Sequence, residues 1–394
     1  MKELQCEILI VGGGLTGLMS AFALSLLKKN IIIIDSFDFI AAEKDKIDLR
    51  TTAIAEGSKE FFKKINIWSK LSKYAEPIKH IKVIDRDENR KINFTNEKKG
   101  KNLGYIIRNA FLKSVLVSIL QTKKNILFFK NTKINCISQS NDFIAASSEN
   151  LFIKAKLLIA ADGKRSTVRD LLKTPIYFKN YNHNALVVNF HHTKNHNNTA
   201  YEFFFNSGPL AILPMQKIKK NLYSSSIIWS NSKNYISNID NINQDFLSSL
   251  LEEKIGKKVG RIKQIVDKQL FNLSAHINTK FYSKRMIYVG DAAHSIHPIA
   301  GQGWNLGVRD IENALNVLKE GIVLGLDIGD PFVCKKFHDQ SFNDSYSLYQ
   351  ITDKLNSIFL SEKFISNKIR QSGFSVIEKN PTIKKYITNF AMGI

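Results

Sequence analysis

The first 35 residues show two different hydrophobic patterns in turn. Residues 4–11 form a β-rich apolar run that ends in a glycine cluster, residues 15–29 have helix-like spacing, and residues 31–35 are again β-rich. The uncharged stretch 8–27 is nearly long enough to cross a bilayer, and Lys2 offers only a weak flank for a signal peptide. The strand–glycine–helix order favours instead a buried parallel strand, a tight turn and a packed helix.

The rest of the chain continues to mix the two patterns. Helical spacing is found at residues 52–65, 109–121, 243–254, 306–319 and from 331 to the end. Strand-like runs separated by turn residues occupy 77–94 (with a turn at 85–89), 126–161, 176–228, 266–271 and 286–290. These elements predict an α/β (α+β) fold in which a nucleotide-binding domain carries an inserted, mostly antiparallel β-sheet domain and a helical C-terminus.

A chain of 394 residues is long enough for two domains. We expect the nucleotide-binding domain to be discontinuous, because the run of strand candidates interrupts it. The predicted bounds are 1–75, 98–175 and 282–345 for the nucleotide-binding domain, 76–97 and 176–281 for the β domain, and 346–394 for the C-terminal helical segment.

The glycine cluster has the spacing of a dinucleotide-binding turn. Gly12, Gly14 and Gly17 lie between the first strand and the first helix, where they permit a tight turn, close approach of a pyrophosphate and close helix–strand packing. The helix N-terminus then offers free N–H groups to the phosphates. Asp35 ends the second strand, at the distance where a carboxylate binds a ribose hydroxyl. The motif does not distinguish NAD from FAD.

Two later stretches repeat the order of a β-run, an acidic residue and small residues. Asp162-Gly163 follows the apolar run that ends at residue 161, and Gly290-Asp291 follows residues 286–289. A carboxylate at a strand end beside small residues allows a sugar chain to approach and form hydrogen bonds. Both stretches are therefore candidates for the same ligand as the glycine turn.

The histidines near the second stretch raise the alternative of a metal site. His294 and His297 are three residues apart and could share a helix face. Pro298 and the glycines after it interrupt a helix, and no third ligand pairs with them, so we expect structural or pocket roles and no metal. The histidines of the Asn-rich β region are expected to be solvated; they are His183, His191, His192 and His196.

Together the motifs resemble the flavoprotein aromatic hydroxylases related to para-hydroxybenzoate hydroxylase, a family with a Rossmann-like FAD-binding domain, and most of the chain follows that order. Four segments look most like the ubiquinone-biosynthesis hydroxylase branch of this family. They are GDAAHSIHPIAGQGWNLGVRD (290–310), DLRTTAI (48–54), LGYIIRNAFL (103–112) and GPLAILP (208–214). The presence of a single GxGxxG motif fits this class, in which the flavin domain itself binds the reductant transiently.

The resemblance implies roles for individual residues. Arg50 and Arg108 would lie along the pyrophosphate and ribityl region, Asp291 would bind the ribityl hydroxyls, and Pro298 with the 301–306 backbone would border the isoalloxazine. The FAD-binding positions that it implies are Gly12, Gly14, Leu15, Thr16, Gly17, Asp35, Arg50, Arg108, Asp162, Gly163, Asp291, Pro298, Gly301, Gln302, Gly303, Asn305 and Leu306. Arg108 stands where that branch is often acidic, and Trp304 where leucine is usual.

The resemblance also implies an activity. The expected enzyme is an FAD-dependent monooxygenase that uses NAD(P)H and O2 to hydroxylate a polyprenylated phenol of ubiquinone biosynthesis through a flavin C4a-hydroperoxide. The flavin performs the chemistry; no residue stands out as a catalytic base, and Pro298 and Trp304 are the pocket candidates. Two alternatives remain: a hydroxylase of a soluble aromatic compound, and a flavin-binding scaffold subunit of a quinone-biosynthesis complex.

Charge and cysteine content bear on partners and location. The net charge of +22 comes from lysines spread over the whole chain without a nucleic-acid-binding motif, which favours an anionic membrane surface over nucleic acid. Three separated cysteines suit a reducing compartment. We therefore expect a cytoplasmic protein, peripheral on the inner face of the membrane, in a quinone-biosynthesis complex or a homo-oligomer. Residues 330–394, with Phe359, Leu360, Phe364 and Ile365, either contact membrane or partners or pack on the flavin domain.

Overall fold

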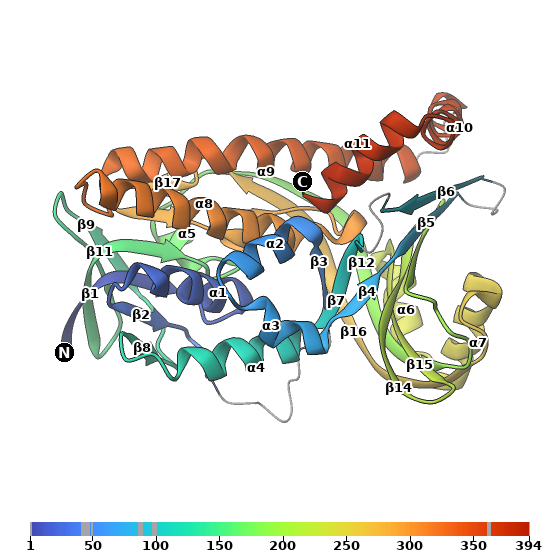
Figure 1. Ribbon diagram of the computed structural model, residues 1–394, viewed down its shortest axis with the longest axis horizontal. Coiled ribbons are helices and arrows are strands. Elements are labelled where there is room, and N and C mark those ends of the chain that lie inside the picture. Colours follow the sequence, from blue (N-terminus) through green and yellow to red (C-terminus); the bar gives the residue numbers. More distant parts are fainter. Residues whose placement is uncertain are drawn as a thin grey trace.

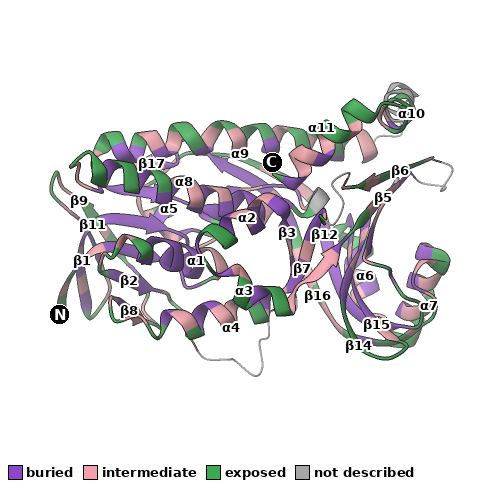
Figure 2. Ribbon diagram, viewed as in Figure 1, coloured by how far each residue is buried: buried purple, intermediate pink, exposed green. Residues whose placement is uncertain are grey.

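The computed structural model describes residues 2–40, 48, 50–85, 90–96, 101–360 and 364–393. Residues 86–89 of the predicted turn and Leu49 of the 48–54 motif lie outside these residues. Two large sheets occupy opposite ends of the molecule in Figure 1, and helices cover their outer faces. Figure 2 shows buried residues running through the middle of both sheets.

The first sheet contains the N-terminal β–α–β unit. Five of its strands are parallel, in the order β18-β11-β1-β2-β8, and the remaining strands β17, β9 and β10 are antiparallel additions. The bounds are β1 Lys2–Val11, β2 Ile31–Ile34, β8 Ile126–Phe129, β9 Cys136–Gln139, β10 Ile144–Ser147, β11 Leu151–Ala160, β17 Tyr282–Ser283 and β18 Met286–Tyr288. The residues at the centre of the sheet are apolar and buried, and they belong to one hydrophobic core.

The second sheet is mostly antiparallel, as the turn-rich middle of the sequence predicts. Its strand order is β19-β16-β12-β15-β14-β13-β5-β6, and only β13 and β5 pair in parallel. The bounds are β5 His80–Asp85, β6 Arg90–Thr95, β12 Ile176–His192, β13 Thr199–Phe205, β14 Gly208–Lys219, β15 Leu222–Ser232, β16 Ile262–Asn278 and β19 His294–Ser295. Helices α6 (Lys233–Asp240) and α7 (Gln244–Ile255) pack on one face of it.

The structure contains a small third sheet where the sequence predicted the start of a helix. Residues 52–65 were expected to be helical, but the structure has strand β3 (Thr51–Ala55) before helix α2 (Glu56–Lys64). β3 pairs with β7 (Gly104–Arg108), which also pairs with β4 (Glu76–Ile78). Pairing with a strand fifty residues away outweighs the helical spacing, which only the second half of the segment retains.

The remaining helices cover the first sheet and the junction between the sheets. Their bounds are α1 Leu15–Leu24, α3 Trp68–Leu71, α4 Asn109–Leu120, α5 Thr167–Leu171, α8 Gly303–Val323, α9 Pro331–Leu360, α10 Phe364–Lys379 and α11 Pro381–Met392. α8 and α9 lie side by side along one flank, and α10 and α11 reach over the end of the second sheet (Figure 1). α9 continues without a break across the predicted boundary at 345/346. Within the described residues, no helix combines the length and the apolar composition needed to cross a membrane.

The C-terminal helices pack on the rest of the chain. The Phe359 ring stacks on Phe204 of the second sheet, with ring centroids 3.7 Å apart. The side chains of Phe364 and Ile365 lie outside the described residues. For Phe359 the structure therefore shows packing within the chain.

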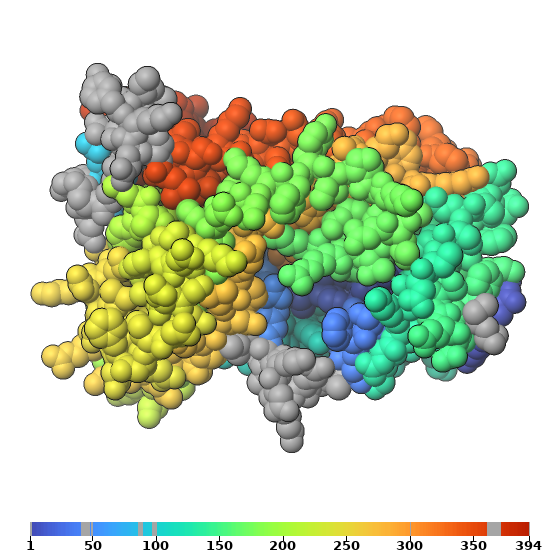
Figure 3. All heavy atoms as spheres, turned by 180° about the vertical axis from the view of Figure 1, so that it is seen from behind, coloured from blue at the N-terminus to red at the C-terminus, as the bar shows by residue number. Residues whose placement is uncertain are grey.

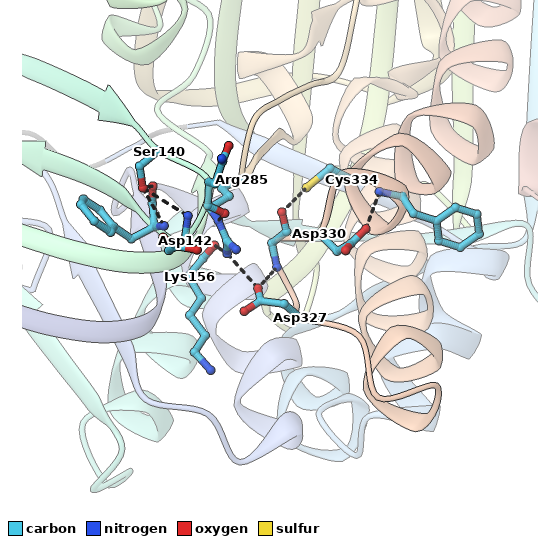
Figure 4. Close-up of polar contacts among 11 residues, drawn as sticks. Ser140, Asp142, Lys156, Arg285, Asp327, Asp330 and Cys334 are labelled. Atoms are coloured by element: carbon cyan, nitrogen blue, oxygen red, sulfur yellow. Dashed lines mark hydrogen bonds and ion pairs between the residues drawn. The ribbon is translucent and has the colours of Figure 1, made fainter.

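Arg285 holds the start of β18 in place. Its Nε donates to the Asn141 carbonyl oxygen over 2.6 Å, and its Nη1 donates to the Lys156 carbonyl oxygen over 3.0 Å and to Asp327 Oδ1 over 2.8 Å. Figure 4 shows this guanidinium between β11 and the segment that joins α8 to α9. Because β18 is only three residues long, these bonds help to place residues 290–291 at the edge of the sheet.

Candidate active site

Four chain segments meet at the carboxyl edge of the parallel sheet. β1, β2, β11 and β18 are parallel neighbours or near neighbours, so the residues that follow them emerge on the same side. These residues are Gly12, Asp35, Asp162 and Asp291, the acidic and glycine positions that the sequence singled out. In Figure 3 this part of the surface is hollowed, with N-terminal residues in blue at the bottom.

The glycine turn is built too tightly for side chains. Gly12 has a φ of +114°, and a Cβ there would lie 2.3 Å from the Ala161 carbonyl oxygen. A Cβ at Gly17 would lie 1.8 Å from the Gly12 carbonyl oxygen, so α1 packs directly on the turn. By contrast, a Cβ at Gly14 would meet no atom within 4 Å. The N-terminus of α1 therefore faces open space, as an anion site requires.

Asp35 has a partner within the protein. Its Oδ2 accepts the Gly13 N–H over 2.5 Å, and its Oδ1 accepts the Phe37 N–H over 2.9 Å. The carboxylate thus fixes the end of β2 against the glycine turn. A carboxylate offers about four lone-pair sites, so acceptor capacity remains for a ribose hydroxyl.

Asp162 has a buried oxygen without a partner in the described chain. Its Oδ2 accepts the Val168 N–H over 3.0 Å at the start of α5, whereas its Oδ1 is buried and makes no hydrogen bond. Burial raises the pKa of this carboxyl group above its ordinary value. Gly163, next to it, has a φ of +79° and open space where a Cβ would stand. An unpaired buried acceptor beside open space fits a hydroxyl-bearing ligand.

Asp291 follows β18 and Gly290 at the same edge of the sheet. Its side chain is exposed, and the charges of Arg50 and Lys164 act on it. Lys164 was not anticipated from the sequence, although it directly follows Asp162-Gly163. Its Nζ donates to the Ser274 carbonyl oxygen over 2.7 Å. Two cations therefore lie near the carboxylate at this edge.

The two predicted arginines lie in different surroundings. Arg50 forms a two-pronged ion pair with Asp48, with both contacts at 2.8 Å, and its guanidinium lies 5.4 Å from the centre of the Phe271 ring. Burial alone would raise the pKa of Asp48, but hydrogen bonds from Arg50 and Asn109 outweigh it and lower the pKa. Arg50 also acts electrostatically on Asp291.

Arg108, at the end of β7, instead faces the second sheet. Burial lowers the pKa of His191 and raises that of Asp267, and the charge of Arg108 acts on both groups. The structure thus brings Arg50, but not Arg108, into the electrostatic surroundings of Asp291.

In the 298–306 segment the side chains of Gln302 and Asn305 bond within the protein, and the backbone N–H groups at the start of α8 remain free of intrahelical bonds. Gly301 has a φ of +60°, and Gln302 donates from its amide to the Ala391 carbonyl oxygen over 2.8 Å. Asn305 is buried and donates to the Ala53 carbonyl oxygen while it accepts from Ala55 N and Ser58 Oγ, all at 2.8 Å. The first N–H groups of α8, which begins at Gly303, have no intrahelical partners.

Several side chains in this segment point into the protein. Leu306 belongs to the core, and Trp304 packs against Phe62 of α2 with ring centroids 5.7 Å apart. Pro298 precedes the short turn of 3-10 helix at Ile299–Gly301.

Two predicted positions lie instead at the start of α1. Thr16 touches Gly290, where a Cβ would lie 2.8 Å from Thr16 Cγ2, and Leu15 is half-buried.

The histidines of the motif face different ways. His294 Nε2 lies 2.6 Å from Asp310 Oδ2, and both side chains are buried. His297 packs edge-on against Tyr181 at 4.8 Å, and burial lowers its pKa to about 4. In the part of the chain that the structure describes, no three His, Cys, Asp or Glu side chains are grouped as metal ligands. Asp310, which also accepts the Gly290 N–H over 2.9 Å, was not recognised in the sequence.

The prediction that the histidines of the Asn-rich β region are solvated is wrong. His192 and His196 are buried, and burial lowers the pKa of His192 to about 4. His183 and His191 are only partly exposed. The Asn-rich stretch around them gave no sign that β12 would lie in the middle of the second sheet.

The fold and the carboxyl edge of the parallel sheet are those of a protein that binds a flavin-type dinucleotide. The glycine turn, the open end of α1 and the unpaired oxygen of Asp162 all fit such a cofactor. The family model described as FAD binding domain matches residues 5–322, and the chain belongs to this family, whose cofactor is FAD.

Individual relatives agree with this class. The chain is 27% identical to ubiquinone hydroxylase UbiL of Rhodospirillum rubrum, over 98% of this chain and 89% of that protein. It is 23% identical to 3-demethoxyubiquinol 3-hydroxylase of Escherichia coli, over the full length of both. Among solved structures, p-nitrophenol 4-monooxygenase PnpA of Pseudomonas putida has the same fold. Its TM-score is 0.79 at 16% identity, covering 100% of this chain and 98% of that one.

Proposed function

We propose that this protein is an FAD-dependent monooxygenase that hydroxylates the aromatic ring of a polyprenylated phenol in ubiquinone biosynthesis. The observation that carries the proposal is the convergence of the glycine turn, Asp162 and Asp291 at one sheet edge, where Arg50 also reaches Phe271 of the second, mostly antiparallel sheet. Relatives named as ubiquinone hydroxylases that span nearly the whole chain support the substrate class.

The chain's own residues would hold FAD as follows. The 12–17 turn would bind the pyrophosphate, with Asp35 near the adenosine ribose and Asp291 near the ribityl hydroxyls. Bound FAD, reduced by NAD(P)H, supplies the activation of O2. The free N–H groups at the start of α8 would stabilise negative charge at the edge of the ring. Arg50, with its counter-ion Asp48, would provide positive charge on the phosphate side.

The arrangement of sheets supports two domains for these two tasks. The segments of the parallel sheet would form an FAD-binding domain, and the antiparallel sheet would supply a wall for the aromatic substrate. The net charge of +22 supports binding of the protein to the anionic inner face of the cytoplasmic membrane, where such a substrate resides. Flotation with vesicles of anionic and of neutral lipids tests this location, and equal binding to both would contradict it.

Turnover by the purified protein tests the proposal. FAD-loaded protein should oxidise NAD(P)H faster when a short-chain prenylated phenol is present, and mass spectrometry should find one added oxygen in the ring. Equal activity on a prenylated and an unprenylated phenol would favour a soluble substrate. Stimulation by no phenol would overturn the enzyme assignment and leave a flavin-binding scaffold.

A variant at the sheet edge tests the cofactor site separately. Asp291→Ala should lower FAD retention on gel filtration by at least about tenfold, because it removes the carboxylate that follows β18 at the edge of the sheet. Asp339→Ala, which removes an exposed carboxylate on α9, is the matched control and should keep FAD. Full retention of FAD by Asp291→Ala would contradict the assigned position.

A further inference from the structure

β13 presents different side chains to the two faces of the second sheet. Side chains alternate along a strand, and Tyr201, Phe203 and Phe205 pack into the cluster beneath α6 and α7. Glu202 must therefore face the opposite side. Its neighbours two residues away on that side are Ala200 and Phe204.

This opposite face is the one turned toward the FAD site. A row of cross-strand neighbours runs from β13 to β16, and it consists of Glu202, Ala211, Ile228, Val187 and Gln269. Phe271 lies two residues beyond Gln269 on the same face of β16, and the guanidinium of Arg50 lies over its ring. The face of the sheet that carries Glu202 is therefore the face that Arg50 contacts at β16.

The Glu202 end of the row also adjoins the FAD site, through Ala200 on the same face of β13. Ala200 belongs to a small apolar cluster against which Ala53 of β3 packs. Ala53 in turn meets Gly301, where a Cβ would lie 3.3 Å from the Ala53 Cβ. A chain of contacts therefore links Gly301, in the expected flavin wall, to the strand that carries Glu202.

Glu202 is the acidic member of an otherwise apolar stretch of this face. Ala211 and Ile228 beside it are half-buried, so no other element fully covers them. Within the described chain Glu202 forms no hydrogen bond and no ion pair. Burial raises its pKa to about 8. The Glu202 side chain is half-buried, and an acid without a partner among apolar neighbours is a candidate functional group.

The charged groups around Glu202 are already paired. On β5, Asp85 shares the face of Glu202 and binds Arg90, while Lys82 lies on the other face over the Tyr201 ring. On α9, Asp353 binds Lys179 at 2.6 Å. On β14, the residue directly opposite is Ala211.

We propose that the carboxyl group of Glu202 contacts the aromatic hydroxyl of the substrate and accepts its proton during hydroxylation. The inference rests on the proposed function. Proton transfer breaks the phenolic O–H bond and leaves a phenolate, whose ring carbon is the better nucleophile toward the oxygen atom supplied by O2. The second oxygen leaves as water, with both electrons from NAD(P)H and two protons. After the ring C–H proton is lost, the neutral Glu202 returns its proton to the product.

Glu202→Gln separates proton transfer from hydrogen bonding, because the amide keeps the size of the side chain and cannot ionise. With the FAD-loaded protein and a short-chain prenylated phenol, kcat/KM of the wild type should rise with pH through about 8, the pKa of Glu202. In Glu202→Gln this rise should disappear and kcat/KM above pH 8 should fall by about a hundredfold. Glu253→Gln, at an exposed position on α7, is the matched control and should behave as wild type.

Binding of a short-chain prenylated phenol of ordinary acidity provides a readout without turnover, because free phenol (pKa about 10) stays mostly protonated at pH 9, where Glu202 is ionised. The ultraviolet absorption of its phenolate should appear at pH 9 on binding to wild-type protein and not on binding to Glu202→Gln. A rise of kcat/KM through the same pH in Glu202→Gln, even with a lower rate, would show that Glu202 only positions the substrate and would overturn the proposal. Loss of FAD or a lowered melting temperature in this variant would overturn it as well, because Glu202 would then be structural. If wild-type protein hydroxylates no phenol, the proposed function fails, and the phenolate spectrum still decides whether Glu202 accepts a proton.

Discussion

Replacing Asp310 by asparagine should loosen the 290–294 segment that carries Asp291. Asp310 Oδ2 lies 2.6 Å from His294 Nε2 and 2.9 Å from the Gly290 nitrogen, and both side chains of the His294–Asp310 pair are almost completely buried. The same carboxylate oxygen thus ties α8 to the backbone and to a side chain of the motif. Asparagine has nearly the same shape and lacks the negative charge.

The magnitude follows from these two contacts. A hydrogen bond to a charged group contributes about 1.5–3 kcal/mol, and a hydrogen bond between neutral groups about 0.5–1.5 kcal/mol. Both bonds go to the same carboxylate oxygen, and asparagine offers a neutral oxygen in its place, so we expect Asp310→Asn to lower the free energy of unfolding by about 2–3 kcal/mol. FAD retention should fall with it, since Gly290 packs directly on Thr16 of α1.

The assay compares urea unfolding and FAD retention of Asp310→Asn with those of Asp339→Asn. The control removes the same charge from an ion pair with Lys335 whose side chains are more than half exposed, and such pairs contribute about 0–1 kcal/mol. Equal stability of the two variants, together with unchanged FAD binding by Asp310→Asn, would refute the role of Asp310 as the anchor of the motif.

The other predictions concern the glycine turn and acid stability. Gly12→Ala should abolish FAD binding or prevent folding, because a methyl group would lie 2.3 Å from the Ala161 carbonyl oxygen. The control is Gly373→Ala, where a methyl group meets no atom within 4 Å; it should behave as wild type in the same FAD titration. Burial lowers the pKa of His192 to about 4 from an ordinary value of 6.5, so the unfolded chain binds a proton that the folded chain does not. The resulting stability is present above pH 6.5 and should be lost as the pH falls toward 4, by about 3 kcal/mol. His192→Gln should reduce this pH dependence in urea unfolding, and an unchanged dependence would contradict it.

The sequence by itself determined the elements whose signals are local. The 12–17 turn follows from steric limits on a few consecutive residues, and Asp162 and Asp291 could be recognised because each follows an apolar strand and stands beside glycine. The parallel arrangement of these strands then places their ends together. In the same way, the alternation of short β-rich runs and turns predicted the second sheet.

Only the tertiary structure decided which partners these residues meet. β3 replaces a predicted helix because its pairing partner, β7, is distant in the sequence. Strand register likewise turns Glu202 toward the FAD site and buries His192, since a shift of one residue would exchange the two faces. Trp304 contacts Phe62, and Asp310 contacts His294, through packing between separate elements. Steric limits and hydrophobic periodicity depend on neighbouring residues and can be seen in the sequence. The direction in which a side chain points depends on segments that come together only when the chain folds.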